Sequence, residues 1–178
     1  MKQVNELKMR LFLVTLSACL LTSPEPAARE IDQARGTASK APVAPTVLFL
    51  CPHGAAKSVL ASAYFQRLAK ERGLNVRVTS AGTEPDPTVA PAVAAHLGKQ
   101  GYTVPTTAPR KASKEDLATA DVVVSIGCDL SGLPAPRGAL VKWDDVPSPS
   151  QDFAGADEAI RKRVVALIEE LARDPLFR

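Results

Sequence analysis

The sequence predicts an α/β fold over residues 46–178, a small three-layer domain with a four-stranded parallel sheet. Along these residues, short apolar runs typical of buried strands alternate with longer segments of helical periodicity. Such alternation favours right-handed β-α-β units, in which parallel strands lie between layers of helices. In folds of this kind the ligand site lies outside the carboxyl ends of the strands.

Four segments have the composition of strands. The first, 46–50, is a continuous apolar run of the kind that is buried on both faces of a sheet. The other predicted strands are 76–80, 121–126 and 140–143.

Four further segments have the composition of helices. Segment 59–72 places apolar residues at helical spacing and is followed by Gly73, a common stop signal. Segment 155–173 carries one apolar stripe, which predicts that it packs along the core. The shorter predicted helices are 91–98 and 113–118, the second capped by Ser113.

The first 18 residues predict a secretory signal, because a basic start is followed by the apolar run 11–18. The sequence that ends in Cys19 resembles the lipobox of bacterial lipoproteins, which implies a lipid anchor on Cys19 in the periplasm or cell envelope. Two alternatives stay open: an ordinary signal peptide with an unlipidated Cys19, or a mis-assigned start before a cytoplasmic domain.

Residues 19–45 predict a flexible linker, because they contain four prolines and few large apolar side chains. Removal of residues 1–18 takes away three basic residues and one acidic residue, so the net charge falls from +3 to +1. That charge gives no basis for a nucleic-acid partner. The membrane tether therefore depends on Cys19 alone.

The chain has only three cysteines and two histidines. Three cysteines are too few for a disulfide scaffold in a chain of this length. The cysteines and histidines also lack the paired spacing of a zinc site. We therefore expect no metal and no cofactor.

The segment after the first strand carries the strongest chemical signal. Cys51 ends the strand, and Gly54, Ala55 and Ala56 leave their backbone N–H groups unobstructed at the start of a helix. These donors and the positive end of the helix can surround a tetrahedral oxyanion and also stabilise a nucleophilic thiolate. Ser58 can hydrogen-bond the sulfur or cap the helix, and Lys57 adds positive charge.

The stretch from Leu48 to Cys51, followed by five residues, a basic residue and Ser58, resembles the low-molecular-weight protein tyrosine phosphatases and the related arsenate reductases. Segment 80–85 is similar to a second signature of that superfamily. Segments 91–93 and 121–128 lean towards the arsenate reductases. The resemblance implies that Cys51 attacks a phosphorylated or oxyanion substrate and forms a covalent thiophosphate-type intermediate.

The sequence departs from the family pattern at Lys57, where the pattern has Arg, and at His53-Gly54, where the phosphatases have Gly-Asn. An ammonium group cannot grip two phosphate oxygens in a planar fork as a guanidinium does. His53 can donate a hydrogen bond to an oxyanion or simply pack at the rim of the site.

The family also places an Asp-Pro pair after the last strand, where the Asp is the general acid. Here the corresponding pair is Ser148-Pro149, and the nearby Asp145 is the candidate acid, with Asp144 as its neighbour. The alternative is a solvated loop carboxylate without a catalytic role.

Cys128 follows the third predicted strand. The resemblance implies that this strand is a neighbour of the first, which would bring Cys128 to the same sheet edge as Cys51 as a redox partner. The third thiol of the arsenate reductases has no counterpart in 133–136. The alternative is a small buried cysteine that packs at the strand end.

The leading hypothesis is an enzyme, a phosphatase-like hydrolase with Cys51 as nucleophile. An arsenate reductase-like oxidoreductase with two thiols and an external thiol reductant is the first alternative. A non-catalytic lipoprotein that binds an oxyanion or senses redox state through Cys51 and Cys128 is the second.

Overall fold

The computed structural model describes residues 43–178. The predicted signal segment 1–18, the anchor Cys19 and nearly all of the predicted linker 19–45 lie outside the described residues.

The domain is built on a four-stranded parallel sheet with the strand order β2-β1-β3-β4. The first strand pairs with β2 on one side and β3 on the other, so the predicted neighbourhood of the first and third strands is confirmed. The strands are β1 (Thr46–Cys51), β2 (Arg77–Gly82), β3 (Val122–Ser125) and β4 (Ala139–Lys142).

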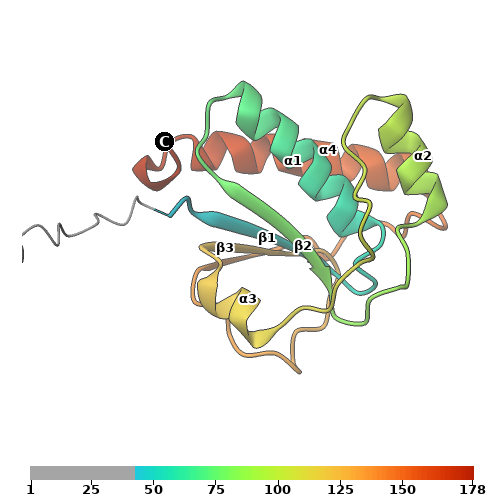
Figure 1. Ribbon diagram of the computed structural model, residues 1–178, viewed down its shortest axis with the longest axis horizontal. Helices are drawn as coiled ribbons and strands as arrows, with labels where there is room; N and C mark the ends of the chain where they lie inside the picture. Colours follow the sequence, from blue (N-terminus) through green and yellow to red (C-terminus); the bar gives the residue numbers. More distant parts are fainter. Residues whose placement is uncertain (1–42) are drawn as a thin grey trace, which may run out of the picture. The chain divides into compact units, whose positions relative to one another are not determined.

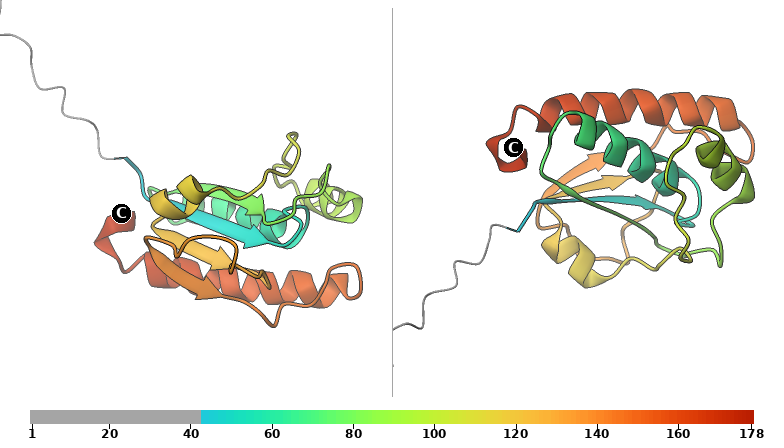
Figure 2. Two further views of the ribbon diagram at one scale, coloured as in Figure 1. Left: turned by 90° about the horizontal axis from the view of Figure 1, so that it is seen from below. Right: turned by 45° about the horizontal axis from the view of Figure 1, so that its top comes forward.

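Helices cover both faces of the sheet and complete the predicted three layers (Figures 1 and 2). On one side lie α1 (Lys57–Glu71), α2 (Pro91–Lys99) and α4 (Phe153–Leu171), and on the other lies α3 (Lys114–Thr119). The α/β fold class predicted from the sequence is therefore confirmed.

The core is divided by the sheet because successive side chains of a strand point to opposite faces. Val47, Phe49 and Cys51 of β1 join the larger cluster under α1 and α4. Leu48 and Leu50 join the smaller cluster on the α3 side. Cys51 therefore faces the helix that begins six residues after it.

The helix boundaries follow local capping. α3 begins as predicted after Ser113, whose side chain and that of Asp116 form a reciprocal capping box. α4 begins at Phe153, two residues before the predicted start, because the Asp152 side chain accepts a hydrogen bond from Gly155 N–H.

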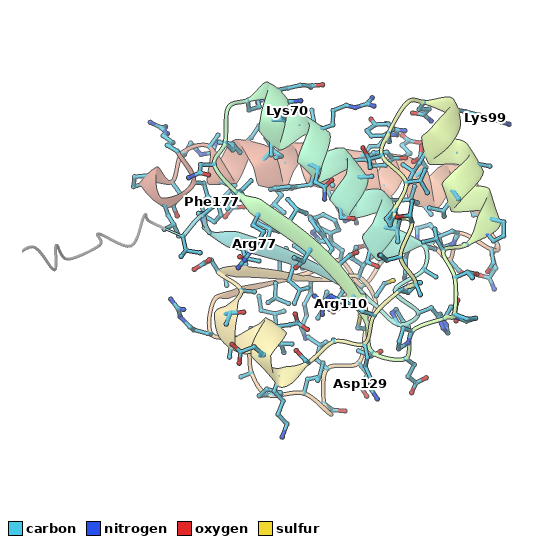
Figure 3. The ribbon with its side chains drawn as sticks, viewed as in Figure 1. Lys70, Arg77, Lys99, Arg110, Asp129 and Phe177 are labelled. Atoms are coloured by element: carbon cyan, nitrogen blue, oxygen red, sulfur yellow. The ribbon has the colours of Figure 1, made fainter. Side chains whose placement is uncertain are left out.

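A short 3-10 helix, η1 (Pro175–Phe177), was not predicted. It buries Phe177 at the end of the sheet where the strands begin, near Arg77, whereas Arg110 lies toward the carboxyl ends of the strands (Figure 3). This element therefore holds the carboxyl terminus of the chain at the end of the sheet opposite to the carboxyl ends of the strands.

Between residues 43 and 178, no helix is long and apolar enough to cross a membrane. The same residues contain no group of three or more acidic, cysteine or histidine side chains placed to hold a metal ion.

Candidate active site

The loop from Cys51 to Lys57 lies at the carboxyl end of β1 and leads directly into α1. Its carbonyl groups are tied to the segment that follows β2: Pro52 O accepts from Glu84 N–H at 2.8 Å, and His53 O accepts from Asp86 N–H at 3.0 Å. The loop conformation is therefore held by backbone bonds that use its acceptors.

The backbone of this loop approaches that of Gly82 unusually closely. A Cβ at Gly82 would lie 2.6 Å from Gly54 N and 2.8 Å from the His53 carbonyl carbon. Gly54 itself has φ +60°, a left-handed conformation that residues with side chains rarely adopt. Both glycines are required for the loop to close against β2.

The donors of the loop are left available. Among the described residues, no backbone N–H from His53 to Ser58 donates to a protein acceptor. No side chain caps the start of α1 and its first turn holds no acidic residue. A ring of N–H groups at an uncapped helix start is a binding site for an anion.

Cys51 lies at the base of this arrangement and is 2% exposed. Its Sγ lies 3.1 Å from Oγ of Ser58, which is fully buried in α1. A hydroxyl at this distance can donate to a thiolate, and charge-assisted bonds of this kind are the stronger ones. Ser58 therefore supports Cys51 from beneath and does not cap the helix.

Lys57 extends from the start of α1 towards the turn after β3. A Cβ at Gly127 would lie 3.0 Å from Lys57 Nζ, so the ammonium group rests against a residue that has no side chain. Lys57 also lines the cavity described next, which brings its charge to the mouth of the loop.

A cavity of about 460 Å³ opens over the loop. Cys51, Lys57 and the predicted oxyanion-binding residues His53, Ala55 and Ala56 line its floor and one side, whereas Gly54 and Ser58 lie outside its walls. The remaining walls come from the segments around α2 and the start of α4 and are mostly apolar: Ala90, Pro91, Ala92, Val93, Pro149 and Phe153.

At the rim of this cavity His53 meets Asp86. His53 Nδ1 lies 3.2 Å from Asp86 Oδ1, and the two side chains are 65% and 49% exposed. Asp86 is the one carboxylate among the residues that line the cavity. Sequence reasoning did not select Asp86, which stands before Pro87 in the chain, and its approach to His53 depends on the loop packing against β2.

The predicted general acid Asp145 is not brought to the cavity. Its carboxylate pairs with Arg163 of α4 at 2.5 Å and is 77% exposed. The same loop contributes Ser148, Pro149 and Ser150 to the cavity wall instead. Asp145 is thus placed as an exposed partner of α4, because Arg163 offers its carboxylate an opposite charge.

Cys51 and Cys128 are both free thiols, the first buried and the second half-buried. Burial raises the pKa of Cys128 to about 11, and the charge of the neighbouring Cys51 raises it too. The Ser125 hydroxyl, the Ile126 N–H and the Lys57 ammonium oppose that rise. The two thiols are therefore coupled electrostatically, but Cys128 does not line the cavity.

Sequence reasoning did not single out Ser125. Its Oγ is buried without a hydrogen-bond partner of ordinary geometry among the described residues. The Ser125 hydroxyl lowers the pKa of the Cys128 thiol. A serine in an apolar strand that ends three residues before a cysteine is the only signal that could have pointed to it.

A larger hollow of about 640 Å³ lies on the outer side of α1, lined by residues such as Arg67, Lys70 and Tyr102. No cysteine lines this hollow, whereas the smaller cavity contains the Cys51 thiol.

Comparison with known proteins agrees with this geometry. The sequence model of a family described as low molecular weight phosphotyrosine protein phosphatase matches residues 46–132. A putative arsenate reductase of Halobacterium salinarum is 28% identical over 131 residues, which cover 71% of this chain and 92% of that protein.

Two solved structures show the same fold. The thioredoxin-dependent arsenate reductase of Corynebacterium glutamicum matches with a TM-score of 0.65 at 26% identity, over 74% of this chain and 63% of that chain. This chain therefore spans less than two thirds of the length of that protein. A low-molecular-weight phosphotyrosine phosphatase from Vibrio cholerae O395 matches with a TM-score of 0.65 at 20% identity, over 74% of this chain and 99% of that one. The described domain, with its cysteine loop between β1 and α1, belongs to the superfamily of low-molecular-weight phosphotyrosine protein phosphatases and arsenate reductases.

Proposed function

We propose that this chain hydrolyses phosphomonoesters with Cys51 as the nucleophile. The observation that carries the proposal is the cavity over Cys51, which joins a floor of unpaired N–H groups to walls of mainly apolar side chains. The floor suits a dianionic phosphoryl group, and the walls suit an apolar organic group attached to it. A bare tetrahedral oxyanion would leave the apolar walls without a partner.

In this proposal the Cys51 thiolate attacks phosphorus and the bond to the ester oxygen breaks. The N–H groups from His53 to Ser58 hold the equatorial oxygens, and the Lys57 ammonium balances their charge. Ser58 stabilises Cys51 as a thiolate before attack and as the leaving group when water hydrolyses the thiophosphate. No metal or cofactor enters these steps.

The test is turnover of 4-nitrophenyl phosphate by the purified protein, its Cys51→Ser variant and its Cys128→Ser variant. We expect release of 4-nitrophenol that is abolished in Cys51→Ser and retained in Cys128→Ser, because Cys128 lies outside the cavity. Equal release by the wild type and Cys51→Ser would overturn the proposal.

Thiol-dependent arsenate reduction is a second candidate, favoured by the interaction between Cys128 and Cys51. The Halobacterium and Corynebacterium relatives are described as arsenate reductases. Here the Cys51 sulfur would bond to arsenic as water leaves arsenate. Cys128 would then attack the Cys51 sulfur. The two thiols would become a disulfide as As(V) becomes arsenite, and an external dithiol would reduce the disulfide.

This candidate is tested by arsenite formation in the presence of arsenate and a dithiol reductant. Cys128→Ser should abolish it while hydrolysis of 4-nitrophenyl phosphate continues, and an unchanged rate of arsenite formation would exclude the two-thiol route. Calorimetric binding of phosphate without either turnover would instead identify the non-catalytic, oxyanion-binding alternative.

A further inference from the structure

The proposed hydrolysis needs a proton for the leaving oxygen, and the segment in which the family resemblance places the acid does not supply one. That segment contributes Ser148, Pro149 and Ser150 to the cavity, and Asp145 is held by Arg163. An unprotonated alkoxide is a poor leaving group, so another residue of the cavity must give the proton.

We propose that His53 is this proton donor and that Asp86 positions its imidazole. The inference rests on the proposed attack by Cys51, and it names the residue that completes the same reaction. His53 and Asp86 both line the cavity that contains Cys51. The Nδ1 of His53 faces Asp86 at 3.2 Å, which leaves Nε2, on the opposite side of the ring, for the ester oxygen.

A backbone hydrogen bond joins His53 and Asp86 in addition to the contact between their side chains. Asp86 N–H donates to His53 O at 3.0 Å, so the two residues are joined before their side chains meet. Both side chains are about half exposed or more, which lets the ring contact a ligand that fills the mouth of the cavity. A carboxylate next to Nδ1 also fixes the orientation of the ring and its tautomer.

The proton has a donor and an acceptor in both steps of the reaction. As the Cys51 sulfur bonds to phosphorus, the phosphorus–oxygen bond breaks and the leaving oxygen takes the proton from His53 Nε2. Neutral His53 then accepts a proton from the water that attacks the thiophosphate, phosphate departs and the Cys51 thiolate returns. The titratable groups that line the cavity with His53 are Asp86, Lys57 and Cys51. The lining residues of the last wall, Ser148, Pro149, Ser150 and Phe153, add none.

The test compares two aryl phosphates with different leaving groups. Phenyl phosphate releases a basic phenolate and depends on protonation, whereas 4-nitrophenyl phosphate releases a stable anion and depends on it little. In His53→Gln we expect kcat/KM for phenyl phosphate to fall about 100-fold or more, with little change for 4-nitrophenyl phosphate.

Asp86→Asn should show a smaller loss with the same dependence on the leaving group, because the imidazole remains. Glu84→Gln is the matched control: it changes a neighbouring carboxylate that lines a different hollow, and neither substrate should respond. Phosphate affinity and the thermal midpoint of His53→Gln should equal those of the wild type, which separates proton donation from binding and folding.

An equal loss for both substrates in His53→Gln would mean that His53 binds the oxyanion or supports the loop, and would overturn the inference. No loss for either substrate would overturn it as well. Failure of the proposed function looks different, because the wild type would then release neither phenol above the Cys51→Ser background.

Discussion

Cys51 Sγ and Ser58 Oγ lie 3.1 Å apart across the loop that joins β1 to α1. The two residues are seven positions apart in the chain, yet the loop returns the start of the helix to the end of the strand. The sulfur is thereby surrounded by N–H groups above and a hydroxyl below. The first prediction concerns this pair.

Ser58→Ala should slow alkylation of Cys51 by iodoacetamide at pH 7 about tenfold. A hydrogen bond to a charged acceptor contributes about 1.5–3 kcal/mol, and this one favours the reactive thiolate. The measurement is the rate of carbamidomethylation of the Cys51 peptide by mass spectrometry. Ser62→Ala is the control, because Ser62 Oγ bonds to Val59 O in the same helix and not to the sulfur. Equal rates in both variants would contradict the assignment.

The second prediction concerns the backbone contact at Gly82. Gly82→Ala should lower the free energy of unfolding by about 1–3 kcal/mol, because its Cβ would overlap the backbone of Gly54. It should also weaken phosphate binding more than stability alone requires, because relief of the overlap must displace the loop. Urea denaturation and calorimetry with phosphate measure the two effects.

Gly98→Ala is the control for this prediction. Gly98 lies in α2 with open space around its Cα, so the same change should raise helix stability by up to about 1 kcal/mol. Phosphate affinity equal to that of the wild type in Gly82→Ala would contradict the role given to the close approach.

The cysteine loop could be predicted from the sequence because its chemistry is contiguous. Strand, thiol, small residues and helix follow one another within 46–58, and each local preference agrees with the others. The predicted strands and helices were correct to within a few residues for the same reason.

The partners of the loop could not be predicted because they come from distant segments. Asp86 reaches His53 only through backbone bonds between two loops, and its own sequence context is that of a turn. Asp145 turns to Arg163, a residue of α4 whose orientation depends on how the last helix packs. Local composition carries no information on either pairing.

The third prediction concerns Cys128. Because burial and then the charge of Cys51 raise its pKa to about 11, Cys128 should resist alkylation at pH 8 and react progressively as the pH approaches 11. Cys51→Ser removes the neighbouring charge, so the midpoint should move down. Ser125→Ala removes a stabilising hydroxyl, so the midpoint should move up. Peptide mass spectrometry across the pH range measures the alkylation of Cys128. Shifts of the midpoint in the opposite directions would contradict the interaction.

The raised pKa of Cys128 also determines how protein stability changes with pH. The folded-state pKa of Cys128 lies above its ordinary value of 9.0, so its contribution to stability is complete below pH 9. That contribution should be lost as the pH rises to 11. In Cys128→Ala this part of the pH dependence should be absent.

The fourth prediction concerns the amino terminus, which lies outside the described residues. If the lipobox-like sequence is processed, protein from the membrane fraction should begin at Cys19 and carry the mass of a lipid modification. Cys19→Ala should remove the added mass and release the protein from membranes. An intact mass that includes residues 1–18 would contradict cleavage before Cys19.

The last prediction concerns Asp157 of α4, which joins three helices. Its carboxylate accepts hydrogen bonds from Tyr64 of α1 and from Arg161 Nε at 2.9 Å, and it lies 3.3 Å from His96 Nε2 of α2. Burial alone would raise the pKa of Asp157, but the hydrogen bonds from Tyr64 and Arg161 outweigh burial and hold it below the usual range. A depressed folded-state pKa stabilises the protein above the unfolded pKa of about 3.9 and ceases to do so as pH falls through the folded value.

Asp157→Asn should therefore lower the free energy of unfolding at pH 7 by about 1–3 kcal/mol, and the difference from the wild type should shrink as the pH falls towards 3. Asp145→Asn is the control, because its carboxylate is 77% exposed and exposed pairs contribute about 1 kcal/mol or less. The Asp157→Asn change should also alter the cavity, because His96 packs edge-on against Phe153, with ring centroids 4.9 Å apart, and Phe153 lines the cavity wall. Urea denaturation at both pH values measures the first effect, and KM for 4-nitrophenyl phosphate the second. A pH-independent difference would show that Asp157 acts through packing and not through its charge.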